Sequence, residues 1–87
     1  MKKFHVTRIS PTKYGFMLKL VSHIVATIEG VGTIERKITR YLHVTTQTSL
    51  TVDQEISIDM SRFNEDARIW VNPETKEEMT LTYLVLK

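Results

Sequence analysis

Polar and apolar residues alternate with a period of two along most of the chain, which is the pattern of half-buried β-strands. The alternation is clean in residues 55–61 and again in a first strand expected over residues 3–10. We expect the first strand to end at Ser10–Lys13, because Pro11 cannot donate to a central hydrogen-bond ladder. No segment gives a convincing helical pattern, so the sequence predicts an all-β protein.

The middle of the chain reads as one long β-hairpin. Residues 14–28 are apolar on both strand parities, and Gly30 and Gly32 then offer the positive φ angles that a tight turn needs. In residues 33–42 the apolar residues could lie either on one face of a helix or on one face of a strand. We favour a strand, because the segment follows a hairpin turn and runs into a β-branched stretch at 43–46.

The C-terminal part is predicted to hold short strands separated by polar turns. We expect a loop at 63–66, a short strand at 67–71, a charged turn at 72–78 and a last strand at 79–86. Five or six short strands in a chain of 87 residues favour one domain, 1–87, built as a small five-stranded OB-like barrel with a long β-hairpin.

The composition of the chain indicates in which cellular compartment the protein is expected. The chain has no cysteine, which excludes disulfides and thiol chemistry and fits a reducing cytosol. The basic N-terminus is not followed by an apolar run of signal-peptide length, and no segment is long enough to cross a bilayer. We therefore expect a soluble cytoplasmic protein, in the host cytoplasm if the protein is viral, with no membrane partner.

No pattern of catalytic residues is present in the sequence. The three histidines His5, His23 and His43 lack the spacing of a metal site. The paired carboxylates Asp53/Glu55 and Glu77/Glu78 lie in segments that look like solvated turns. The lone Gly30-x-Gly32 has no helix signature after it, so it does not indicate a phosphate-binding loop. We expect no enzymatic activity, no cofactor and no small-molecule substrate.

The charges divide between the two halves of the chain. Residues 1–43 carry eight Lys or Arg against two acids, a formal charge of +6, whereas residues 44–87 carry four against eight, a charge of −4. Such a dipole steers polyanions towards the basic side.

Basic and aromatic residues are interleaved across the predicted hairpin, which is the combination that single-stranded nucleic acid requires: cations for the phosphates and rings for the bases. Phe16 is assigned to the core. Tyr14, Tyr41 and Trp70 could each lie in the core or stack on a base, with the core favoured for Trp70. The candidate nucleic-acid-binding residues are Lys13, Tyr14, Lys19, Arg36, Lys37, Arg40, Tyr41 and Trp70.

The segment Glu55–Phe63, the terminal strand 79–87 and the long hairpin 14–45 together resemble the small single-stranded DNA-binding proteins of phages, which have an OB fold. In plan the chain is similar to the gene V proteins of filamentous phages. The resemblance implies cooperative, largely sequence-independent binding of single-stranded DNA, with RNA as an open alternative, by a homodimer during replication or recombination. It places Lys19, Arg36, Lys37, Arg40 and Tyr41 on the binding hairpin.

Two other functions remain open from the sequence. The acidic segment 53–78 could be the active surface of a small protein-interaction or inhibitor module that docks on a basic groove. Exposed strand edges that pair between subunits would instead indicate a structural or assembly role. The expected effect of charge reversals in the acidic segment separates the first of these functions from DNA binding.

Overall fold

The computed structural model describes residues 1–45 and 50–87, and these form an open, mixed β-sheet. Thr46, at the end of the predicted β-branched stretch, lies outside the described residues. Seven elements follow in chain order: β1 (Lys2–Thr12), β2 (Gly15–Ile28), β3 (Gly32–Val44), β4 (Glu55–Ile58), the 3₁₀ helix η1 (Met60–Arg62), β5 (Phe63–Val71) and β6 (Glu78–Leu86).

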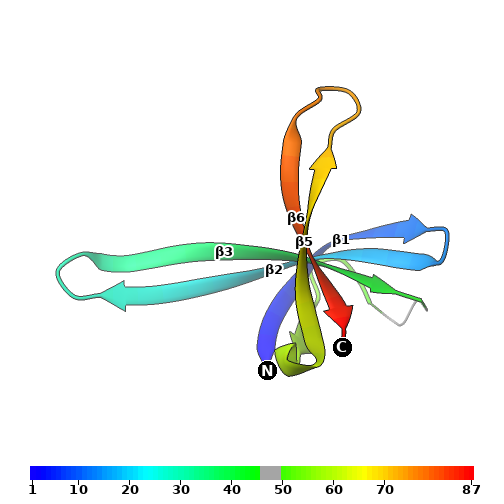
Figure 1. Cartoon of the computed structure of the whole chain (residues 1–87). Helices are drawn as coiled ribbons and strands as arrows, with labels where there is room; N and C mark the ends of the chain where they lie inside the picture. Colours follow the sequence, from blue (N-terminus) through cyan, green and yellow to red (C-terminus); the bar gives the residue numbers. More distant parts are fainter. Residues whose placement is uncertain (46–49) are drawn as a thin grey trace.

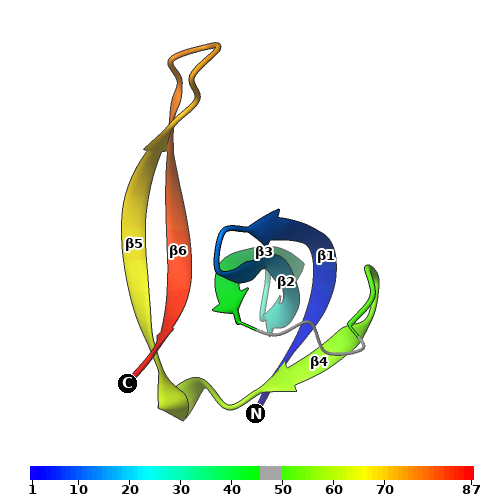
Figure 2. The same ribbon diagram turned by 90° about the vertical axis from the view of Figure 1, so that its right-hand side faces the viewer.

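The strands are ordered β4-β1-β2-β3-β6-β5, and β3 and β6 are the parallel pair. All-β is confirmed, but the closed five-stranded barrel is wrong. Within the described residues β4 pairs only with β1 and β5 only with β6, so the two edge strands do not meet. β4 is only four residues long and is followed by η1, and β5 then pairs along its whole length with the next strand, β6, instead of with β4. Figure 2 shows the result: β1, β2 and β3 curl tightly, while β4 and the β5–β6 hairpin lie on opposite sides of them.

The β2–β3 hairpin is confirmed, and the ambiguous segment 33–42 is strand. Its register runs without interruption from Phe16 opposite Val44 to Ile28 opposite Gly32. Gly30 and Gly32 have φ values of +82° and +105°, which explains why glycine stands at both positions of the turn. In Figure 1 this hairpin extends to the left, far from the rest of the sheet, whereas the β5–β6 hairpin extends upward.

Two boundaries differ from the sequence prediction. β1 continues through Pro11, which lies opposite Phe16 of β2. β4 covers only Lys2–His5 of β1, so Pro11 lies where the strand has an open side and the missing N–H breaks no ladder. The predicted loop at 63–66 is instead the first part of β5, which pairs continuously with β6.

The core is small and lies inside the curl of the sheet. Around it pack half-buried side chains that include Ile9, Leu42 and Phe63. The buried apolar residues of the described chain are Phe4, Val6, Leu18, Leu20, Ile58 and Leu84.

Asp59 caps η1, and this cap predicts a loss of stability in acid. The Ser61 hydroxyl donates to Asp59 Oδ1 at 2.6 Å, and the Ser61 N–H donates to the same oxygen at 3.1 Å. These two hydrogen bonds, together with the nearby Arg62 cation, lower the pKa of the Asp59 carboxyl below its ordinary value of 3.8. A lowered pKa in the folded state stabilises the protein above pH 3.8, and that contribution is lost as the pH falls through the folded value. Asp59→Asn should therefore reduce the acid sensitivity of unfolding, measured as the difference in urea midpoint between neutral and acidic pH; an unchanged difference would show that the cap does not contribute.

Candidate nucleic-acid interface

The curled sheet has a core face and an open face, and residues directly opposite one another across paired strands share a face. Leu18 opposite Leu42 belongs to the core face. The next residue of each strand, Lys19 opposite Tyr41, therefore points to the open face. Lys19 and Tyr41 were both candidates from the sequence, and the structure brings them together.

One line of residues crosses five strands on the open face, and we call it the central row. Arg8 of β1 lies opposite Lys19, and Tyr41 lies beside Tyr83 of β6 in the parallel pair. Asp66 of β5 lies opposite Tyr83 and ends the row. The central row is thus, in order, Arg8, Lys19, Tyr41, Tyr83 and Asp66.

The two tyrosines of the central row are packed against each other, with ring centroids 5.7 Å apart and ring planes tilted by 42°. Both tyrosines are half-buried, so packing restricts their rings while part of each side chain stays exposed to solvent. Lys19 and Tyr41 also line two shallow hollows of about 100 and 230 Å³, one towards β1 and one towards β6. Cations and ordered rings therefore stand next to each other on an accessible surface.

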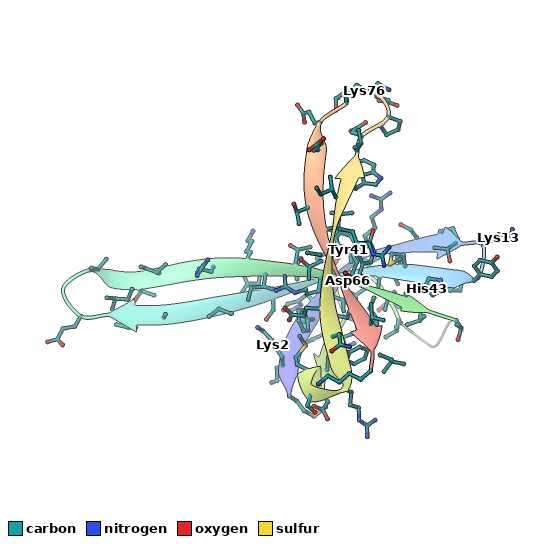
Figure 3. The ribbon with its side chains drawn as sticks, viewed as in Figure 1. Lys2, Lys13, Tyr41, His43, Asp66 and Lys76 are labelled. Carbon is teal, nitrogen blue, oxygen red and sulfur yellow. The ribbon has the colours of Figure 1, made fainter. Side chains whose placement is uncertain are left out.

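Lys13 and Tyr14 form the turn between β1 and β2, at a distance from the central row. The Lys13 ammonium lies 5.6 Å from the centroid of the Tyr14 ring, and that ring is 73% exposed. Tyr14 is therefore outside the core. At about 3.3 Å per residue, the turn lies roughly 15 Å along β2 from Lys19. Figure 3 shows Lys13 at the end of the β1–β2 arm and Tyr41 in the middle of the molecule.

The hairpin cations are divided between the two faces. Lys37 lies opposite His23 on the same face as Tyr41, whereas Arg36 lies opposite Ile24 on the other face. His23 Nδ1 lies 2.8 Å from Glu35 Oε1, and this contact places a carboxylate close to Lys37. Arg36 and Arg40 share one face of β3, but it is the core side of the sheet and not the side of the central row.

Arg40 is partly buried and forms an ion pair with β5. It lies opposite the buried Leu20, its side chain is 21% exposed, and its Nη2 donates to Glu65 Oε2 of β5 at 3.3 Å. β3 and β6 share a register at only two residue pairs, so this contact adds a link between β3 and the β5–β6 hairpin.

We expect Arg40→Ala to lower the free energy of unfolding by about 1–2 kcal/mol, because it removes a half-buried ion pair together with the packing of the arginine stem. Urea denaturation measures this change. Arg36→Ala is the matched control, since Arg36 is exposed on the same face, and it should cost less than about 0.5 kcal/mol. Equal losses for the two variants would contradict the structural role of Arg40.

Trp70 lies on β5 opposite Met79, on the face of the central row, and is 42% exposed. It is not part of the buried core, so the favoured assignment of Trp70 to the core is wrong. It lies four residues from Asp66, or about 13 Å along the strand.

Sequence reasoning missed Arg8 and Tyr83 as site residues, and also the face formed by Asp66 and Arg68. Arg8 entered only the charge count. The one sequence signal for Tyr83 was its place in the alternating last strand, which does not say which strand lies beside it.

No family model, curated protein or solved structure matches the chain. None of the helices among the described residues has the length and apolar character needed to cross a membrane.

Proposed function

We propose that this protein binds single-stranded DNA, without enzymatic chemistry and largely without regard to sequence, on the open face of β1, β2, β3 and β6. The observation that carries the proposal is the central row, in which Arg8 and Lys19 stand beside the packed rings of Tyr41 and Tyr83. Arginine and lysine neutralise phosphates, and an ordered aromatic ring offers a surface on which any base can stack.

Single strands suit this surface better than duplexes do. The bases of a duplex are stacked inside it and cannot reach the tyrosine rings, whereas those of a single strand are free. The row also changes sign along its length, from Arg8 to Asp66, so the backbone of a bound strand should follow the β1–β2 side and avoid β5. Lys13 and Tyr14, in the β1–β2 turn, and Lys37, on the open face of β3, would contact more distant parts of the bound strand.

We also propose that the protein is a homodimer and that the β5–β6 hairpin supplies the contact. Ile69 and Val71 are 69% and 47% exposed, and they point to the face of the hairpin opposite Trp70. A second copy on that face would cover these side chains and leave the central row open. Ile69→Asp should then convert the dimer to a monomer in sedimentation analysis, and a monomeric wild-type protein would overturn this assignment.

The test of binding uses Trp70, which is the only tryptophan of the chain. The protein is titrated with an oligothymidylate at low and at high salt, and tryptophan fluorescence and gel mobility are followed, with a duplex as the control. We expect tight, salt-sensitive binding of the single strand and weak binding of the duplex. No binding of the oligothymidylate at low salt would overturn the proposal.

Charge reversal in the acidic hairpin turn separates DNA binding from the protein-interaction alternative. Glu74, Glu77 and Glu78 are exposed at the turn of the β5–β6 hairpin, whereas Arg8 and Lys19 belong to β1 and β2. Replacing the three glutamates with lysine should leave single-stranded DNA affinity nearly unchanged apart from a general charge effect. A module that acts through its acidic surface would instead lose its partner.

A further inference from the structure

A cleft opens beside the central row, where β3 and β6 separate. The two strands are in register at Tyr41–Tyr83 and Leu42–Leu84, and no further pair joins them within the described residues. The resulting cleft has a volume of about 490 Å³. Its lining residues are Leu42, His43, Asp66, Arg68, Tyr83, Leu84, Val85 and Leu86.

The cleft combines an apolar interior with a polar rim. Leucines and Val85 provide the apolar part, and the rings of Tyr83 and His43 provide flat surfaces. His43 is held in place, since its Nε2 atom lies 2.9 Å from the Thr12 hydroxyl. A site with this lining suits a flat, weakly polar ring system better than a flexible or strongly charged ligand.

The rim carries a hydrogen-bond acceptor next to donors. Arg68 Nε donates to Asp66 Oδ2 at 2.9 Å, which leaves the other carboxylate oxygen and the remaining guanidinium N–H groups for a ligand. Both side chains remain partly exposed to solvent. The edge of guanine offers the complement, with two N–H donors beside the O6 acceptor.

The cleft and the central row form one continuous surface. Tyr83 and Asp66 belong to both, and Figure 3 shows Tyr41, Asp66 and His43 in the middle of the molecule, around the place where the β5–β6 hairpin crosses β3. A strand whose phosphates lie at Arg8 and Lys19, and whose base stacks on Tyr41, would bring a neighbouring base to the mouth of the cleft.

We propose that this cleft takes one unstacked base of the bound strand and that it prefers guanine. The inference rests on the proposed binding of single-stranded DNA, and adds to it a position at which the base matters. The carboxylate of Asp66 accepts from the guanine N–H groups, Arg68 donates to O6, and the ring lies between the Tyr83 and His43 side of the cleft and its apolar floor.

The test compares two oligonucleotides of about nine nucleotides, a length typical of a single-strand-binding site. One is plain oligothymidylate, and the other is the same sequence with a single central guanine. Affinities are measured by Trp70 fluorescence at one fixed low salt concentration. We expect the guanine oligonucleotide to bind about tenfold more tightly, which is the size of one good base contact.

Two substitutions tie this difference to the cleft. Val85→Trp should fill the cleft and Asp66→Asn should remove its acceptor charge, and each should abolish the preference for guanine. Val25→Trp is the matched control for Val85→Trp, because Val25 is also an exposed strand valine but lies on the β2–β3 hairpin; it should keep the preference. Val85→Trp should still bind plain oligothymidylate in a salt-dependent manner.

The two proposals fail in different ways. Equal affinities of the wild-type protein for the two oligonucleotides, or a guanine preference that survives Val85→Trp, would overturn the base cleft while leaving DNA binding intact. Failure to bind either oligonucleotide would overturn the proposed function itself.

Discussion

Replacing Arg8 and Lys19 together with alanine is expected to weaken single-stranded DNA binding by roughly 30- to 100-fold at low salt. Contacts with charged groups are worth about 1.5–3 kcal/mol each, and part of this is recovered because water solvates the released phosphates. The same variant should also weaken the salt dependence. The slope of log affinity against log salt concentration should become less negative by about 1.4, because each phosphate contact on a single strand contributes about 0.7 to that slope. The measurement is a fluorescence titration with oligothymidylate at several salt concentrations.

The matched control for this variant removes two positive charges elsewhere. Arg62 and Lys87 are exposed and lie outside the central row, so the double change to alanine alters the net charge by the same amount. It should reduce affinity by less than about threefold and leave the salt slope nearly unchanged. If the two double variants lost affinity equally, binding would depend on net charge alone and the central row would not be the site.

The local parts of the fold could be predicted from the sequence, because local residues determine them. Gly30 and Gly32 fix the turn, and the turn fixes the register of β2 and β3, including the pairing of Lys19 with Tyr41. Closure of the barrel is a non-local property. It depends on whether β4 and β5 meet, and no pattern in the sequence reports that the chain turns at η1 before they can do so.

The proposed binding surface was predictable only on the hairpin itself. Arg8 reaches the central row through a register shift between Val6 and Arg8, which moves β1 by one residue relative to β2. Alternation alone would place Arg8 on the face of Val6, which is buried. Tyr83 reaches the row through the short parallel pairing of β3 with β6, between segments about forty residues apart in the chain.

Arg36 and Arg40 were both predicted to bind DNA, but they share the core side of the sheet and not the side of the central row. Alternation tells which residues of a strand share a face, but it does not tell which face is covered. Arg40 is covered because β5 passes close enough for Glu65 to bind it. The assignment of Arg40 to the DNA site was therefore based on residue type, whereas its surroundings come from the tertiary fold.

Gly15→Ala is expected to destabilise the protein by about 3 kcal/mol or more. Gly15 has a φ of +148°, a conformation that residues with a side chain rarely adopt. A Cβ atom there would overlap the carbonyl oxygen of Val44 and lie 2.9 Å from the Cα atom of Thr45. Both obstacles are backbone, so no side-chain rotation relieves them, and β1, β2 and β3 must separate where they meet.

Thermal unfolding measures this effect, and Gly30 provides the control. Gly30 also has a positive φ, +82°, but a Cβ atom added there would have no neighbour within 4 Å among the described residues. Gly30→Ala should therefore cost only the backbone term of about 1–2 kcal/mol. In a domain of this size the two variants should melt roughly 5–10 °C apart. Equal melting temperatures would show that the contact between Gly15 and the end of β3 does not limit stability, and that backbone conformation alone explains the glycine.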